Sequence, residues 1–278
     1  MKKPIAVSLA LAAALLLAAC GSENGGAVTS TTTHAQANIT ENSTKNNETT
    51  PEPEKTAEAE TPESAVQYAE PAAEDFEYNY DAVLGGVKIT KYNGDAVAIR
   101  IPVELDGDPV KQFKLDNEEV THVEIPDGFA EINESAFYNC RSLTSVIIPD
   151  SVTAIGGAAF SMCLSLTDIT IPDGVTEIGS SAFWDCNELV SINIPDGVTE
   201  IGSNTFWGCR NLTEITIPDG VTLIGNSAFV YCTKLRSLTL PDNVTVKKSA
   251  FYGCDGLTVT CNGEQYTYAN DPGRWWVE

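Results

Sequence analysis

The sequence contains a strict 23-residue repeat, and few folds are compatible with a repeat of this length. Two residue types mark the period: cysteine at positions 140, 163, 186, 209 and 232, and phenylalanine at positions 137, 160, 183, 206 and 229. A unit of this length is too small to hold a core of its own, so it buries its apolar face by stacking on its neighbours. The period predicts a solenoid, with function on the surfaces that stacking creates.

The order of residue types within one unit predicts the path of each coil. In residues 166–171 apolar and polar side chains alternate, which is the pattern of a strand with one buried face. Pro172 ends this strand, and Asp173-Gly174 supplies a turn in which glycine can adopt positive φ. Gly179 is expected to hold a left-handed conformation, and the ring of Phe183 to fill the interior. The glycine recurs at 156, 202 and 225, with Asn133 in its place in the first unit.

Six such units occupy residues 120–256, and the last is one residue shorter. The shared pattern is L-T-x-I-x-I-P-D-G-V-T-x-I-G-x-x-A-F-x-x-C-x-x. It resembles the leucine-rich repeat of the BspA-type family of bacterial surface proteins. The resemblance implies a β-rich leucine-rich-repeat solenoid with one parallel sheet, roughly 30 Å long if strands lie about 4.8 Å apart.

A solenoid exposes an apolar cross-section at each end, so caps are expected. Residues 79–119 predict an N-terminal cap with a degenerate repeat: 99–102 repeats the I-x-I-P strand, and 106–109 suggests an inserted hairpin. Residues 257–278 predict a C-terminal cap that uses the bulky side chains Tyr266, Tyr268, Trp275 and Trp276.

The first twenty residues have the pattern of an export signal. Lys2 and Lys3 precede an uncharged apolar run, 5–19, that ends at Cys20. Residues 17–20 resemble the lipobox of bacterial lipoproteins, which implies a lipoprotein signal peptide over 1–20 and lipid attachment at Cys20. An ordinary signal peptide followed by a chance cysteine is the alternative. The lipid anchor predicts a protein on the outer face of the bacterial membrane, at the cell surface.

Residues 21–78 are rich in Ser, Thr, Asn, Glu, Ala and Pro and contain few large aliphatic side chains. Such a segment cannot bury enough apolar surface to offset its ordering entropy, so a disordered linker is expected. It is also acidic, and like charges favour extension: a chain of this length spans about 40 Å as a relaxed coil and more when stretched. We interpret it as a spacer between membrane and solenoid.

The cysteines allow two interpretations. In an exported chain, disulfides between neighbouring coils are possible. One interior cysteine per unit is more simply explained as a column of small buried thiols. Cys254 and Cys261 are the pair best placed for a disulfide. No metal site is expected, because the column offers single thiols and the solenoid contains one histidine, His122.

One aspartate per unit also recurs at a fixed place: Asp127, Asp150, Asp173, Asp196, Asp219 and Asp242. A column of carboxylates could attract calcium, yet one carboxylate per coil is too few for the six to eight oxygens that calcium takes, unless neighbouring loops help. A turn-capping role is the preferred interpretation.

Two surfaces are candidates for ligand binding. The residue after each core phenylalanine should point toward solvent, and it is aromatic at Tyr138, Trp184, Trp207 and Tyr252. Exposed aromatic patches mark binding surfaces, although these rings could also only shield the coil edges. The second candidate is the polar outward face of the strands, made of Thr167, Asp168, Thr170, Ser191, Asn193, Thr213, Glu214 and Thr216. A solvated face without a partner is its alternative.

Composition limits the function classes. The net charge of −23 disfavours nucleic acid and direct adsorption to anionic lipid. The sequence contains no phosphate-binding loop, nucleophile elbow or zinc-protease motif, so neither an enzyme nor a cofactor is expected. Carboxylate pairs of a glycoside hydrolase cannot be recognised from sequence alone, and that reading is the least favoured.

The family resemblance implies binding of proteins or glycans outside the cell, and adhesion to host or extracellular-matrix proteins or contacts between bacteria in particular. The alternative from another class is an envelope scaffold or accessory lipoprotein that binds the cell's own wall polymer.

Overall fold

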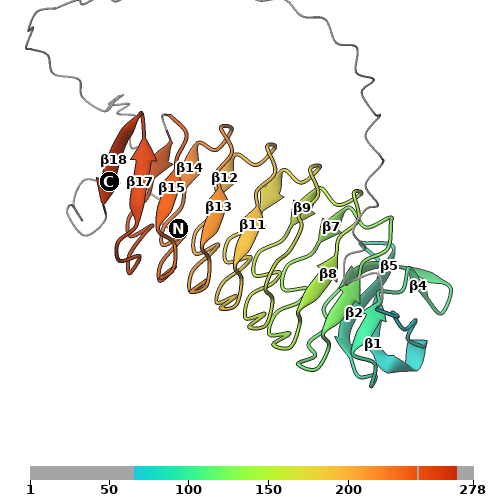
Figure 1. Ribbon diagram of the computed structural model, residues 1–278. Coiled ribbons are helices and arrows are strands. Elements are labelled where there is room, and N and C mark those ends of the chain that lie inside the picture. The colour runs from blue at the N-terminus through green and yellow to red at the C-terminus, as the bar shows by residue number, and fades with distance from the viewer. Residues whose placement is uncertain (1–65, 243, 268–278) are drawn as a thin grey trace, which may run out of the picture. The chain divides into compact units, whose positions relative to one another are not determined.

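The structure is a computed structural model that describes residues 66–242 and 244–267. All of them belong to one compact unit, 60–278. In this unit consecutive coils stack side by side along one axis, so that equivalent strands face one another from coil to coil (Figure 1). The predicted solenoid of leucine-rich-repeat type is confirmed.

Two sets of short parallel strands run along the solenoid, one on each side of the coils. The first ladder holds the I-x-I strands: β3 (Ala98–Arg100), β6 (His122–Glu124), β8 (Ser145–Ile147), β11 (Ser191–Asn193), β13 (Glu214–Thr216), β15 (Ser237–Thr239) and β17 (Thr258–Cys261). The second ladder holds two-residue strands before the recurrent glycine: β7 (Glu131–Ile132), β9 (Ala154–Ile155), β10 (Glu177–Ile178), β12 (Glu200–Ile201), β14 (Leu223–Ile224) and β16 (Thr245–Val246).

Neither ladder is continuous. The first pairs in the orders β3-β6-β8, β11-β13 and β15-β17-β18, and the second in the orders β10-β9-β7 and β12-β14-β16. The predicted parallel pairing of equivalent strands is confirmed, and it is divided among several shorter sheets. The strands on either side of each break are not hydrogen-bonded to each other.

The segment 166–171, where a strand is predicted, lies at one of these breaks. Ile169 and Ile171 are buried as the alternation predicts, yet the segment is not a strand. The side chain of Asn193 in the next coil takes both backbone groups of Ile171: its Oδ1 accepts from the Ile171 N–H at 3.0 Å, and its Nδ2 donates to the Ile171 carbonyl at 2.9 Å. A carboxamide thus occupies the place of a neighbouring backbone, and regular pairing is lost.

The N-terminal cap is a four-stranded sheet in the order β1-β2-β5-β4. Its strands are β1 (Phe76–Asp81), β2 (Gly86–Tyr92), β4 (Glu104–Leu105) and β5 (Asp108–Phe113), preceded by the 3-10 turn η2 (Ala73–Asp75). The predicted hairpin at 106–109 is confirmed, because β4 and β5 pair antiparallel around Asp106 and Gly107, both at positive φ. β1 begins before residue 79, the boundary that composition suggested, because Phe76 is buried against Tyr92.

At the other end, β18 (Glu264–Thr267) pairs antiparallel with β17 and contains Tyr266. The predicted cap residues Tyr268, Trp275 and Trp276 lie outside the described residues, as do Cys20 and the expected signal peptide. No helix in the part of the chain that the structure describes is long and apolar enough to cross a membrane.

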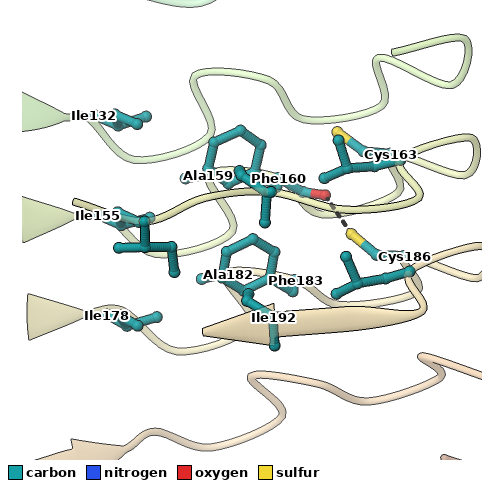
Figure 2. Packing of buried hydrophobic residues seen from close by; sticks show 14 of the residues in the cluster. Ile132, Ile155, Ala159, Phe160, Cys163, Ile178, Ala182, Phe183, Cys186 and Ile192 are labelled. Carbon is teal, nitrogen blue, oxygen red and sulfur yellow. Dashed lines mark hydrogen bonds between the residues drawn. The ribbon is translucent and has the colours of Figure 1, made fainter. Parts of the chain in front are cut away.

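A column of phenylalanine rings runs through the interior. Phe137, Phe160, Phe183, Phe206, Phe229 and Phe251 are all buried. Neighbouring rings stack with centroids 5.0–5.7 Å apart and planes within 20° of parallel. Figure 2 shows Phe160 and Phe183 in this arrangement, with Ile155 and Ile178 on the side of the second ladder. Because each ring contacts the ring above and below, the column couples the coils to one another.

The recurrent glycine is required for close approach of the coils and not for positive φ. Gly156, Gly179, Gly202 and Gly225 do not have positive φ, so that expectation was wrong. A Cβ at Gly179 would lie 2.4 Å from the backbone N of Gly157 in the preceding coil. In the first unit Asn133 fits because its neighbour is the cap: its Oδ1 accepts from the Phe113 N–H at 2.9 Å.

The Pro-Asp-Gly-Val turns are closed by the backbone. In the turn at 172–175 the Val175 N–H donates to the Pro172 carbonyl at 3.0 Å, and the turns at 149, 195 and 218 repeat this bond. Within the described residues no hydrogen bond ends on a carboxylate oxygen of the recurrent aspartates, and the backbone closes the turns instead, so the turn-capping prediction was wrong. The carboxylates of this column are therefore free to face solvent.

The cysteines form the predicted column of buried thiols. From Cys163 to Cys254, each Sγ lies near the carbonyl of a phenylalanine in the preceding coil; Cys186, for example, donates to Phe160 at 3.1 Å (Figure 2). The other pairs are Cys163 with Phe137, Cys209 with Phe183, Cys232 with Phe206 and Cys254 with Phe229, at 2.9–3.3 Å. Cys254 is a buried thiol and does not form the suggested disulfide with Cys261.

Burial makes these thiols weak acids, and this predicts a pH dependence of stability. Burial raises the pKa of Cys140 to about 11, whereas an unfolded chain ionises a thiol near pH 8.5. The stability that Cys140 contributes is complete below pH 8.5. It is lost as pH rises toward 11, because the unfolded state releases the proton first, at a slope of up to about 1.4 kcal/mol per pH unit.

The comparison of wild type with Cys140→Ala isolates this contribution. Between pH 8.5 and 9.5 the free energy of unfolding of wild type should fall by about 1 kcal/mol more than that of the variant. Urea denaturation under reducing conditions at both pH values measures the difference. Parallel pH profiles of the two proteins would show that Cys140 ionises normally and would contradict its burial.

Candidate surface for protein binding

Three of the predicted aromatic residues lie in a contiguous line on the solenoid surface. The line, called here the aromatic row, consists of Trp184, Trp207, Tyr231 and Tyr252 in four successive coils. Backbone bonds between coils hold it in place: the Asp185 N–H donates to the Trp207 carbonyl, and the Tyr231 N–H donates to the Tyr252 carbonyl at 2.8 Å. The row therefore sits on a fixed backbone and not on a loop tip.

The rings of the row contact one another in sequence. Trp184 and Trp207 are half-buried and stack with centroids 5.0 Å apart and planes 17° from parallel. Trp207 then meets Tyr231 edge to face at 5.6 Å, and Tyr231 meets Tyr252 in the same way at 5.7 Å. Tyr252 is 54% exposed. Such pairs stabilise each other by about 0.5–1.5 kcal/mol beyond their area burial, so the row is preorganised.

Tyr231 is a member of the row that the sequence pattern missed. Val230 holds the position after Phe229, where the pattern places the exposed residue, and is buried. Tyr231 follows in a left-handed conformation with φ 60°, which is uncommon for a bulky side chain. Its ring covers Gly253 of the next coil, where a Cβ would lie 2.4 Å from the tyrosine Cδ1. The sequence signal for this contact is Gly253, directly after Tyr252, because a residue without a side chain leaves room for an aromatic ring of the preceding coil.

Tyr138 does not join the row. It is 38% exposed, and the Lys114 Nζ lies 5.9 Å from its ring centroid. In the coil between Tyr138 and Trp184 the equivalent residue is Ser161, which is buried. The predicted stripe is therefore interrupted, and Tyr138 stands apart from it.

The second predicted surface, the outward face of the first ladder, is exposed, but several of its side chains are already engaged. Thr167 donates to Asp168 at 3.1 Å, and Thr213 donates to the Val190 carbonyl at 3.3 Å. Asn193 is committed to the backbone of Ile171. The remaining members, Thr170, Ser191, Glu214 and Thr216, are exposed. This face offers single polar groups and no large anchor.

Groups that could support chemistry are sparse. His122 lies beside Thr121, whose Oγ1 is 2.9 Å from its Nδ1. Across residues 66–242 and 244–267, no three His, Cys, Asp or Glu side chains are grouped as they would be to hold a metal ion. The aromatic row is thus the most distinctive surface feature of the solenoid.

The repeat is similar to repeats in known protein families and solved structures. The BspA type Leucine rich repeat region matches residues 110–235 and 155–267, in six copies. Among solved structures, a T. pallidum leucine rich repeat protein is 34% identical with a TM-score of 0.50, and the match covers 60% of this chain and 91% of that one. No curated protein matches the sequence.

A leucine rich cell surface protein from Faecalibacterium prausnitzii A2-165 is 38% identical, with a TM-score of 0.57. The match covers 68% of this chain and 54% of the F. prausnitzii protein, so this chain spans about half of that relative. Both neighbours are bacterial leucine-rich-repeat proteins. The matched repeats occupy more than half of the sequence, and this chain belongs to the BspA-type leucine-rich-repeat family.

Proposed function

We propose that this chain is a lipid-anchored bacterial surface protein that binds other proteins outside the cell, in adhesion to host or extracellular-matrix proteins, through its aromatic row. The observation that carries the proposal is the row itself: four aromatic side chains in contact on a rigid backbone, at least partly exposed to solvent. Aromatic residues held in one conformation are typical anchors of protein interfaces.

Ring orientation favours a protein over a glycan as the partner. A sugar packs its C–H groups on an open aromatic face, where the ring is electron-rich. In the row, Trp184 and Trp207 cover one face of each other, and the Tyr231 contacts are edge to face. Each of the two tryptophans therefore has one face that a sugar cannot reach. Edges carry partial positive charge and suit carbonyl oxygens and aromatic faces of a protein.

The anchor is part of the proposal and rests on the sequence around Cys20. A diacylglyceryl group on this cysteine would hold the chain at the membrane, and residues 21–78 would separate the solenoid from it. The mass of the mature N-terminal peptide tests this step. An unmodified peptide, or one that begins at another residue, would remove the anchor from the account.

The binding proposal is tested with the full chain on an array of extracellular-matrix proteins, mucins and bacterial wall glycans. We expect saturable binding to a protein component, weakened at least tenfold in the double variant Trp184→Ala/Trp207→Ala, because buried aromatic anchors often contribute about 2 kcal/mol or more each. The double variant should lose only about 1–2 kcal/mol of stability, since its rings are half-buried.

Tyr138→Ala is the matched control, because it removes an exposed aromatic ring outside the row. Its binding should equal that of wild type. Two results would overturn the proposal: equal losses in the control and the double variant, or binding to wall glycans only. The second result would favour an envelope scaffold.

A further inference from the structure

An acidic crevice crosses the second ladder, on surface that the aromatic row does not use. Its volume is about 550 Å³, and it is lined by residues of β7, β9, β10 and β12 and the turns after them. Three carboxylates line it: Glu131, Glu177 and Glu200. Thr176, Thr199 and Ser180, which carry hydroxyl groups, and Gly156, Gly157, Gly179 and Gly202 also line it.

The crevice coincides with a gap between two coils. In the second ladder the N–H of Gly156, Gly179 and Gly225 each donates to an isoleucine carbonyl of the preceding coil at 2.7–2.8 Å. The equivalent bond from Gly202 to Ile178 is absent from the described residues, and β10 does not pair with β12. Both Gly202 and Ile178 are buried, so a backbone donor and acceptor stand without a protein partner.

Thr205 lies beside the gap and is the residue at which this coil departs from the repeat. The other coils have alanine at this position, namely Ala136, Ala159, Ala182, Ala228 and Ala250. Thr205 is fully buried, and its Oγ1 donates to the Gly202 carbonyl at 3.0 Å. The coils are farther apart at Gly202 than at the equivalent glycine: a Cβ at Gly202 would have its nearest neighbour at 3.2 Å, against 2.4 Å at Gly179.

The carboxylates of the crevice have no cation to balance them. Glu131, Glu177 and Glu200 are exposed, and no lysine, arginine or histidine lines the crevice. Within the described residues the ion pairs involve Arg100 and Arg141, which lie elsewhere. In this column Ala154 lies between Glu131 and Glu177, and Leu223 follows Glu200, so Glu177 and Glu200 are the two carboxylates in adjacent coils. The local potential is therefore negative and favours a basic occupant.

We propose that this crevice binds an extended basic segment of a partner protein. Three coil steps of about 4.8 Å separate Glu131 from Glu200, about 14 Å in all, and four residues of extended chain span about 13 Å. Alternate lysine or arginine side chains of such a segment can thus meet the carboxylates. A guanidinium or ammonium group that enters the gap also supplies a donor for the Ile178 carbonyl.

The test uses the full chain and a fluorescein-labelled K-T-K-T-K-T-K peptide, with fluorescence anisotropy as the readout. We expect saturable binding that weakens as salt rises, and at least tenfold weaker binding to Glu177→Gln/Glu200→Gln. The matched control is Asp168→Asn/Glu214→Gln, which changes the net charge equally on the outward face of the first ladder. Its affinity should remain within threefold of wild type.

Variants of Thr205 distinguish binding in the crevice from non-specific attraction to acidic side chains. Thr205→Ala should let the coils close and weaken peptide binding, although every carboxylate is retained. Thr205→Val keeps the volume and should bind as wild type does. Equal losses in the two carboxylate double variants, or binding without saturation, would show non-specific attraction and overturn the proposal. Should Thr205→Ala bind as tightly as wild type, the gap would play no part.

Discussion

Phe183→Ala is expected to lower the free energy of unfolding by about 4 kcal/mol, which is the range for loss of a fully buried phenylalanine. Phe183 is 0% exposed and stacks on Phe160 at 5.3 Å and on Phe206 at 5.6 Å. Its removal leaves a cavity between two rings and so weakens contacts on both sides. In a solenoid stability is the sum of coil and interface terms, and this change damages two interfaces at once.

Chemical denaturation of the full chain measures this effect, and Trp184→Ala is the matched comparison. Trp184 follows Phe183 directly, yet it is half-buried and contacts one ring of the row. We expect its replacement to cost no more than about 1.5 kcal/mol. A larger loss for Trp184→Ala than for Phe183→Ala would mean that the two side chains have been assigned to the wrong sides of the coil.

Gly179→Ala is expected to lower the free energy of unfolding by about 3 kcal/mol, at the upper end of the range for overpacking. Its Cβ would lie 2.4–2.8 Å from three backbone atoms of Gly156 and Gly157. A backbone cannot rotate out of the way as a side chain can. The substitution must therefore push two coils apart and break the bond from the Gly179 N–H to the Ile155 carbonyl.

Gly202→Ala is the control, because the same substitution meets the open gap. The nearest atoms to its Cβ would be 3.2–3.3 Å away and include the hydroxyl groups of Ser180 and Thr205. We expect a change within about 1 kcal/mol, since the loss of glycine entropy in the unfolded chain offsets the tight contact. Urea denaturation measures both changes. Equal losses in the free energy of unfolding for Gly179→Ala and Gly202→Ala would contradict the gap between the coils at Gly202.

The sequence was sufficient for the solenoid because its signals are repeated in every coil. The period fixed the stacking of Phe183 and Cys186 on their equivalents, and the alternation at Ile169 and Ile171 predicted which side chains are buried. The hairpin at Asp106-Gly107 was also predictable, because these residues favour its two left-handed positions. A position that recurs in every coil can be predicted even when one coil departs from the pattern.

What the sequence could not show lies where one coil departs from the others. Asn193 fits the polar strand pattern, yet its side chain bonds the backbone of Ile171 in the preceding coil, where a strand would supply a backbone partner. Thr205 is a small change from alanine, yet it coincides with the interruption of the second ladder. Tyr231 belongs to the aromatic row, although the pattern places the exposed residue one position earlier, at Val230. Each depends on contacts between coils, which a one-dimensional pattern does not contain.

The recurrent glycine illustrates the same limit in another form. The repeat predicts a glycine at this position and suggests positive φ as the reason, because glycine adopts positive φ at no steric cost. The structure places the left-handed residues elsewhere, among them Ser181 and Asp185. Distance to the next coil, and not backbone conformation, selects glycine at Gly179.

Hydroxyl-radical footprinting of the full chain, with and without the protein captured on the array, tests directly whether the partner binds the aromatic row. The account predicts that oxidation of Trp184, Trp207, Tyr231 and Tyr252 falls in the complex, while Tyr138 remains as reactive as in the unbound chain. Unchanged oxidation of the row, with protection confined to the outward face of the first ladder, would contradict the account and place the partner on the polar strands instead.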